Sequence, residues 1–92
     1  MQPVGQLLHG ALAELVRDAP LSEGKVQLAW RAAVGPALER VTTVRLQDRV
    51  LVVETVSAPW AREISRSSAM ILARVQAVLG EPAVQRIAVR RP

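Results

Sequence analysis

The sequence predicts a small α+β domain in which helices pack on a three-stranded sheet, in the order helix, helix, strand, strand, helix, strand. Apolar residues recur at helical spacing before residue 35 and again after residue 59. Residues 41–57 and 84–91 are instead rich in valine and other strand-forming residues. With 92 residues, 50% of them apolar, the chain can build one core, so we assign 1–92 to a single domain.

Two helices are predicted before the sheet. The first covers residues 4–16, where apolar side chains recur every three or four positions, and it stops before Pro20. The second follows Ser22, which has the chemistry of an N-cap, and ends at Gly35. Glycine accepts the left-handed conformation of a helix end and the following proline cannot continue the helix, so Gly35 is predicted to be a structural anchor. A short helical turn is expected over residues 36–40.

Residues 41–46 and 50–57 are predicted to form a β-hairpin with a tight turn between them. In the second strand, Leu51 and Val53 alternate with Val50 and Val52, so both faces of the strand are largely apolar. The second face of the sheet is therefore expected either to lie under a helix or to be offered to a partner.

One long helix is predicted over residues 59–79, with Pro59 at its first position. Its apolar arc includes Trp60 and is expected to face the core. Trp30 and Trp60 are the only aromatic residues of the chain, so both are predicted to anchor the core, with direct partner contact as the alternative. Residues 84–91 alternate well enough to form the closing strand.

The residue inventory argues against an enzyme. The chain has one histidine and no cysteine or tyrosine, and it contains neither an HExxH motif nor a glycine-rich phosphate loop. We therefore expect no catalytic residues, metal or cofactor. The first 13 residues lack the cationic start of a signal peptide. A bilayer-spanning helix needs about 20 apolar residues, and every apolar run in the sequence is much shorter. These features predict a cytoplasmic protein without membrane contact.

The excess positive charge lies in the last third of the chain. The net charge is +4, yet residues 1–58 hold equal numbers of basic and acidic side chains. Because the planar guanidinium group pairs well with phosphate, the arginines after residue 58 are candidates for binding nucleic acid or an acidic partner. They are Arg62, Arg66, Arg74, Arg86, Arg90 and Arg91. An ordinary solvated surface is the alternative.

Small side chains are predicted beside these arginines on the exposed side of the long helix. Ala69, Ala73 and Ala77 would let a second helix or a phosphate backbone approach closely, although alanine is also the best helix former and needs no function. The chain contains no GxxG loop and no aromatic strip on which bases could stack. DNA binding is therefore expected to be weak, directed at the backbone and insensitive to sequence.

Four segments together resemble the DUF721 family, whose members are DciA-like: AWRAAVG at 29–35, VRLQDRVLVVETVSAPWAREIS at 44–65, ILARVQAVLG at 71–80 and VQRIAVR at 84–90. The resemblance implies a KH-like fold. It also implies a bacterial protein that binds the replicative DNA helicase and DNA, and that promotes helicase loading at the start of replication without ATPase activity of its own.

The sequence departs from the family pattern at two positions. Arg49 stands where the hairpin usually has glycine, and Val41 stands where histidine commonly precedes Thr42. Longer relatives add a basic tail, so the DNA affinity of this sequence is expected to be weak. Three functions remain open: a helicase adaptor with auxiliary DNA contact, a stand-alone KH-like RNA- or DNA-binding module, and a homo-oligomeric scaffold that uses the apolar sheet face.

Overall fold

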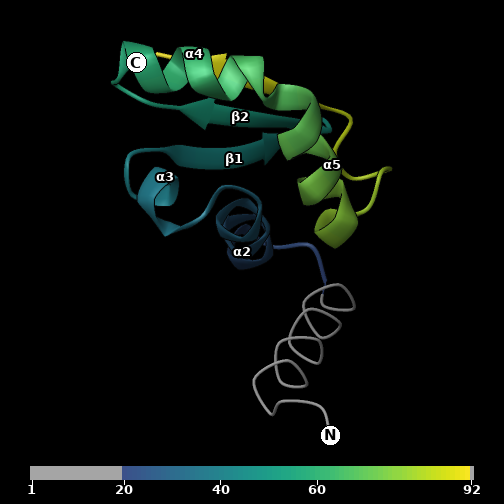
Figure 1. Ribbon diagram of the computed structural model, residues 1–92. Coiled ribbons are helices and arrows are strands. Elements are labelled where there is room, and N and C mark those ends of the chain that lie inside the picture. The colour runs from purple at the N-terminus through teal and green to yellow at the C-terminus, as the bar shows by residue number, and fades with distance from the viewer. Residues whose placement is uncertain (1–19, 92) are drawn as a thin grey trace, which may run out of the picture.

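The computed structural model of the chain describes residues 20–91 (Figure 1). The elements are α2 (Glu23–Val34), α3 (Pro36–Arg40), β1 (Thr43–Gln47), β2 (Val50–Glu54), α4 (Ala58–Arg66), α5 (Ser68–Leu79) and β3 (Arg86–Arg90). The predicted α+β class, with helices and a three-stranded sheet, is confirmed. The helix predicted over residues 4–16 lies outside the described residues.

The sheet has the strand order β1-β2-β3, with β2 at its centre. β1 and β2 form the predicted antiparallel hairpin, in which Leu46 lies opposite Leu51. β2 and β3 are parallel, with Leu51 opposite Ile87. A parallel pair needs a crossover connection, which α4 and α5 supply.

Helices α2, α4 and α5 contribute buried residues to one core against one face of the sheet. Leu51 and Val53 of β2 are fully buried in this core, together with Trp30 of α2 and Ile64 of α4. The strand residues that also pack against it are Val44, Leu46, Ile87 and Val89. Because successive strand residues point to opposite faces, the remaining strand residues point away from this core.

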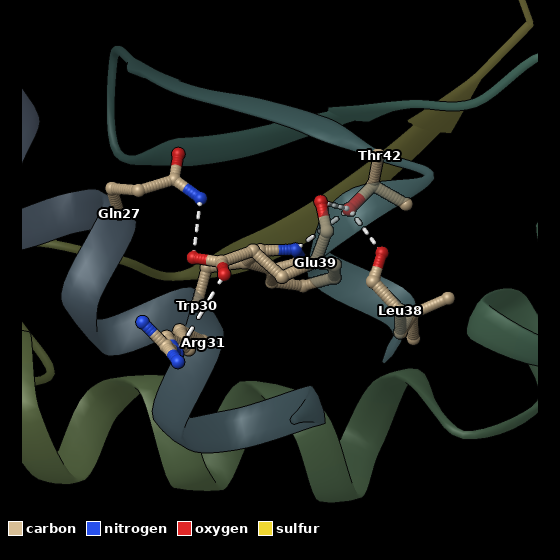
Figure 2. Close-up of polar contacts among 6 residues, drawn as sticks. All are labelled: Gln27, Trp30, Arg31, Leu38, Glu39 and Thr42. Carbon is tan, nitrogen blue, oxygen red and sulfur yellow. Dashed lines mark hydrogen bonds and ion pairs between the residues drawn. The ribbon is translucent and has the colours of Figure 1, made fainter. Parts of the chain in front are cut away.

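The indole of Trp30 is the largest fully buried side chain, and its one polar atom has a partner. Trp30 Nε1 donates a hydrogen bond of 2.9 Å to Thr42 Oγ1, and the Thr42 hydroxyl donates one of 2.8 Å to the backbone oxygen of Leu38 (Figure 2). The core anchor of α2 is thereby tied to the residue that leads into β1.

A second set of polar contacts joins α2 to α3 at the surface beside Trp30 (Figure 2). Glu39 of α3 accepts a hydrogen bond of 2.9 Å from Gln27 Nε2 and lies 3.7 Å from Arg31 Nε. The sharp turn that brings α3 back to α2 occurs at Gly35, where φ is 86°. A Cβ at Gly35 would meet no atom within 4 Å, so this backbone conformation is the reason that glycine is favoured there.

The predicted long helix over residues 59–79 is wrong in one respect, because it is broken at Ser67. Ser67 has φ −97° and ψ 12°, and it ends α4 and precedes α5. Figure 1 shows α4 running along the sheet and α5 turning toward α2, and the contacts of α4 with β3 and of α5 with α2 agree. Serine is a weak helix former, and three serines lie near the junction. The break therefore loses little helix stability compared with the packing that both helices gain.

The prediction that Trp60 anchors the core is also wrong. Trp60 is 41% exposed, whereas Ile64, one turn later, is fully buried. The first turn of α4 is held by Ser57, whose hydroxyl accepts a hydrogen bond of 3.3 Å from the Trp60 backbone nitrogen, and Pro59 lies in the same turn. This turn follows the end of β2 (Figure 1), and Ile64 rather than Trp60 occupies the core-facing position of α4.

The hairpin between β1 and β2 contains two residues with left-handed backbone. Asp48 has φ 50° and Arg49 has φ 66°. Two-residue hairpin turns of this kind favour glycine at the second position, because side chains other than glycine are strained there. The backbone oxygen of Arg49 also accepts a hydrogen bond of 2.7 Å from the Gln85 nitrogen, which fixes the hairpin to the start of β3.

The two tryptophans are expected to differ sharply in their effect on stability. Trp30→Ala should lower the free energy of unfolding by about 3–5 kcal/mol, because it leaves a large cavity and removes the donor to Thr42. Trp60→Ala should lower it by about 1 kcal/mol or less, because the indole is partly exposed. Urea unfolding followed by circular dichroism measures both. Equal losses of stability in the two variants would contradict the burial of Trp30 and the exposure of Trp60.

Replacing Arg49 by glycine should stabilise the protein. Arg49→Gly relieves the left-handed strain, less the added freedom of glycine in the unfolded chain, for a net gain of about 0.5–1 kcal/mol. Arg49→Ala is the matched control, since it removes the same charge but keeps a Cβ in the strained position. Thermal melting should place the glycine variant above the parent and above the alanine variant. A glycine variant that melts below both would show that the arginine side chain itself stabilises the turn.

Candidate nucleic-acid and partner interface

The face of the sheet that points away from the core is basic, and we call it the open sheet face. The strand register places three residues side by side in each row across it. The rows are Gln47, Val50 and Arg86; Arg45, Val52 and Ala88; and Thr43, Glu54 and Arg90. None of these residues belongs to the core cluster.

Val52 lies at the centre of the open sheet face and is only 3% exposed. It is flanked by Arg45 and Ala88 in its own row, and the stems of arginine side chains cover apolar surface while their charged ends stay in water. The Arg45 side chain is 55% exposed, in agreement with that arrangement. The apolar second face expected from β2 is therefore small, and Val52 at its centre is almost fully covered.

The charges on this face are only partly compensated. Arg45 Nη2 lies 3.5 Å from Glu54 Oε1. Arg86 and Arg90 are exposed, and neither forms an ion pair with any residue in the range 20–91 that the structure describes. A hollow of about 410 Å³ lies on this face and reaches the hairpin; it is lined by Gln47, Asp48, Arg49, Val50, Val52, Gln85, Arg86, Ala88 and Arg90.

Arg62 and Arg66 lie elsewhere, on the exposed side of α4. Arg66 Nη1 is 3.5 Å from Glu63 Oε2 on the same helix. Because α4 buries Ile64 in the core, it lies on the helix-covered side of the sheet, whereas Arg86 and Arg90 project from the other side. The break at Ser67 further separates these two arginines from the exposed alanines of α5, so they do not form the continuous strip that one long helix would give.

Exposed apolar residues occur where β1 begins and where β2 leads into α4. They are Val41, Val56 and Trp60, which are 41%, 81% and 41% exposed, and we call these three residues the end patch. Val41 and Val56 line a hollow of about 430 Å³ together with Arg40, Thr42, Thr43, Glu54 and Thr55. Tryptophan and arginine are enriched at protein interfaces, so an exposed tryptophan on a helix that also exposes arginines is a candidate for protein contact.

Residues 3–89 match the family model described as Dna[CI] antecedent, DciA. The chain belongs to the DciA family. A UPF0232 protein of Mycolicibacterium paratuberculosis is 29% identical over 99% of this chain and 51% of its own length. One of Mycolicibacterium smegmatis is 30% identical over 95% and 47%. The chain thus spans about half the length of the curated relatives it matches, and no solved structure is significantly similar to it.

The described part of this DciA-family chain has neither a metal cluster nor a bilayer-spanning helix. Within residues 20–91, His, Cys, Asp and Glu form no group of three or more that could hold a metal ion. No helix in the same range has the length and hydropathy needed to cross a membrane.

Two arginines, one on the open sheet face and one in its hairpin turn, were not among the binding candidates predicted from the sequence. Arg45 and Arg49 belong to the first 58 residues, where equal numbers of basic and acidic side chains conceal any local excess. Strand alternation could have identified Arg45. In the hairpin register Arg45 lies opposite Val52, so both side chains are on the sheet face that points away from the core. For Arg49, the signal was an arginine at a turn position that favours glycine.

Arg74, by contrast, is occupied within the fold, while Arg91 is exposed directly after β3. Arg74 Nη1 donates a hydrogen bond of 3.1 Å to the backbone oxygen of Ala33. That oxygen belongs to the last turn of α2, where backbone oxygens lack partners within the helix and a cation is favourable. Arg74 therefore joins α5 to the end of α2.

Removing Arg74 should cost stability, while removing an arginine of α4 should not. Arg74→Met keeps most of the apolar stem but loses the bond to Ala33, which should lower the free energy of unfolding by about 1 kcal/mol. Arg62→Met is the matched control on an exposed position and should change it by no more than about 0.5 kcal/mol. Chemical denaturation of both variants tests this, and a parent-like Arg74 variant would return Arg74 to the set available for binding.

Proposed function

We propose that this DciA-family chain is a non-enzymatic adaptor of the bacterial cytoplasm that binds the replicative DNA helicase and assists its loading on DNA. In this role it contacts DNA without regard to sequence. Support comes from the family match over residues 3–89, and from the positions of the arginines on two different sides of one small sheet. Two separate surfaces allow a protein and a nucleic acid to be held at the same time.

The form of the DNA contact follows from the side chains available. The junction between α4 and α5 is the single residue Ser67, so there is no glycine loop that could clamp nucleotides there. The open sheet face carries no aromatic residue on which a base could stack. Arginines directed at phosphate remain, and such contacts are weak, insensitive to sequence and sensitive to salt.

The helicase contact is proposed for the other side of the molecule. Arg62 and Arg66 present two cations there, and Val56 and Trp60 add exposed apolar side chains at the start of the same helix. A helix that exposes both an aromatic residue and arginines suits a protein partner with acidic residues around an apolar contact.

A stand-alone KH-like RNA- or DNA-binding module is the second candidate. The open sheet face favours it, since that face needs no protein partner to attract a polyanion. The two functions differ in one measurable property, which is direct affinity for the helicase.

Calorimetric titration with purified replicative helicase should show binding by the parent chain. The double variant Arg62→Glu with Arg66→Glu should weaken that affinity by about tenfold or more, because like charges at an interface are strongly unfavourable. The double variant to glutamine is the graded control and should have a smaller effect. Both should melt close to the parent, because the two positions are exposed.

DNA binding is measured in parallel with single- and double-stranded oligonucleotides of mixed sequence at increasing salt. Affinity should fall steeply with salt and depend little on sequence. A parent that binds DNA but not helicase would replace the adaptor by the stand-alone module. Sequence-selective binding that survives high salt would contradict the backbone contact.

A further inference from the structure

The DNA contact of the proposed function can be assigned to one surface, and the inference rests on that contact. We propose that the open sheet face and its hairpin hold the phosphate backbone through Arg45, Arg49, Arg86 and Arg90, and that the arginines of α4 do not. Two of these four residues lie in the first 58 residues, whose charges balance, so net charge alone does not reveal the site.

The register gives this face the dimensions of a short stretch of nucleic acid. Arg86 and Arg90 are four residues apart on one strand, which places their backbones about 13 Å apart. Arg45 lies two strands away from β3, about 10 Å across the sheet. A distance of about 13 Å corresponds to the rise of about four nucleotides along one strand of a duplex. The cations therefore surround an area that several consecutive phosphates can cover.

The balance of charge also favours this face over α4. Four arginines on the open sheet face and its hairpin stand against two carboxylates, Glu54 and Asp48. On α4, Arg62 and Arg66 stand against Glu63, and Arg66 lies in an ion pair with it. The face thus holds more cations and a larger excess of them, on a rigid sheet that fixes their spacing.

Glu54 limits the positive potential of the face. It lies 3.5 Å from Arg45 and beside Arg90 in the strand register. When phosphate approaches, this carboxylate both competes for Arg45 and repels the ligand. It moderates affinity, which suits a protein that has to release DNA.

The strained turn provides an independent observation. Arg49 keeps a left-handed backbone, φ 66°, at a position where glycine would be more stable, and it lines the hollow on this face. A strained residue that the fold does not require indicates a function for its side chain. A guanidinium at the rim of a basic hollow has the chemistry to contact phosphate.

The small apolar area of the face argues against a protein as its main ligand. Its apolar residues are Val50, Val52 and Ala88, and Val52 is already covered. Protein interfaces draw most of their energy from apolar and aromatic residues in a desolvated centre, which this face lacks. Phosphate needs only the exposed guanidinium groups.

Two double variants with the same change in net charge test the assignment. Arg86→Gln with Arg90→Gln alters the open sheet face, and Arg62→Gln with Arg66→Gln alters α4. Fluorescence anisotropy with a labelled oligonucleotide of mixed sequence should show a loss of about tenfold for the first pair, with a salt slope smaller by about two units. The second pair should lose less than about threefold. Equal losses, or a larger loss for α4, would overturn the assignment, provided that circular dichroism shows both variants folded.

Two single variants then distinguish a specific phosphate site from a general effect of net charge. Arg49→Gly should bind DNA more weakly although it is more stable than the parent, and Glu54→Gln should bind more tightly. Parent-like affinity for both would overturn the proposal. Loss of helicase binding with unchanged DNA binding in the Arg86/Arg90 variant would also overturn it and identify the face as a protein interface. A parent that binds no DNA would defeat the DNA contact of the proposed function itself, which is a different result from a parent that binds through α4.

Discussion

The hydrogen bond from the buried Trp30 indole to Thr42 is the interaction on which the arrangement of the other elements depends. It lies where α2, the end of α3 and the start of β1 meet, and an unpaired indole N–H in that place would be costly. With Thr42 fixed, β1 enters the sheet in one register, and β2 and β3 follow from it by pairing. The spacing of the arginines on the open sheet face is therefore set by a contact on the opposite side of the sheet.

The central strand links stability to function in this small domain. Leu51 and Val53 fill the core on one side, and Val52 on the other side is covered by the side chains around it. A strand that is apolar on both faces is held firmly, so the charged residues paired with it on β1 and β3 gain a rigid support. The open sheet face uses side chains that the core does not need, so substitutions of its arginines should leave the fold intact.

Local sequence rules were sufficient for the order of helices and strands from α2 onward, but not for the division of the last helix into α4 and α5 or for their directions. Gly35 and the hairpin were predictable because their backbone preferences are intrinsic to the residues, and Trp30 because a buried indole gains so much contact area. The break at Ser67 depends on two helices finding different packing partners, and the periodicity of residues 59–79 continues through it. Trp60 is exposed because Ile64, one turn later, occupies the core-facing position of α4. The open sheet face could be recognised only from the strand register, which places Arg45 and Arg90 on the same face of the sheet.

The crossover between β2 and β3 makes the basic face a late product of folding. Arg45 and Arg49 belong to a local hairpin, but Arg86 and Arg90 reach them only after α4 and α5 have brought β3 alongside β2. Contacts between residues far apart in sequence close more slowly than hairpin contacts. A chain with an unpaired β3 would present only two of the four arginines on this side of the sheet. The positive surface therefore exists as a unit only in the fully paired sheet.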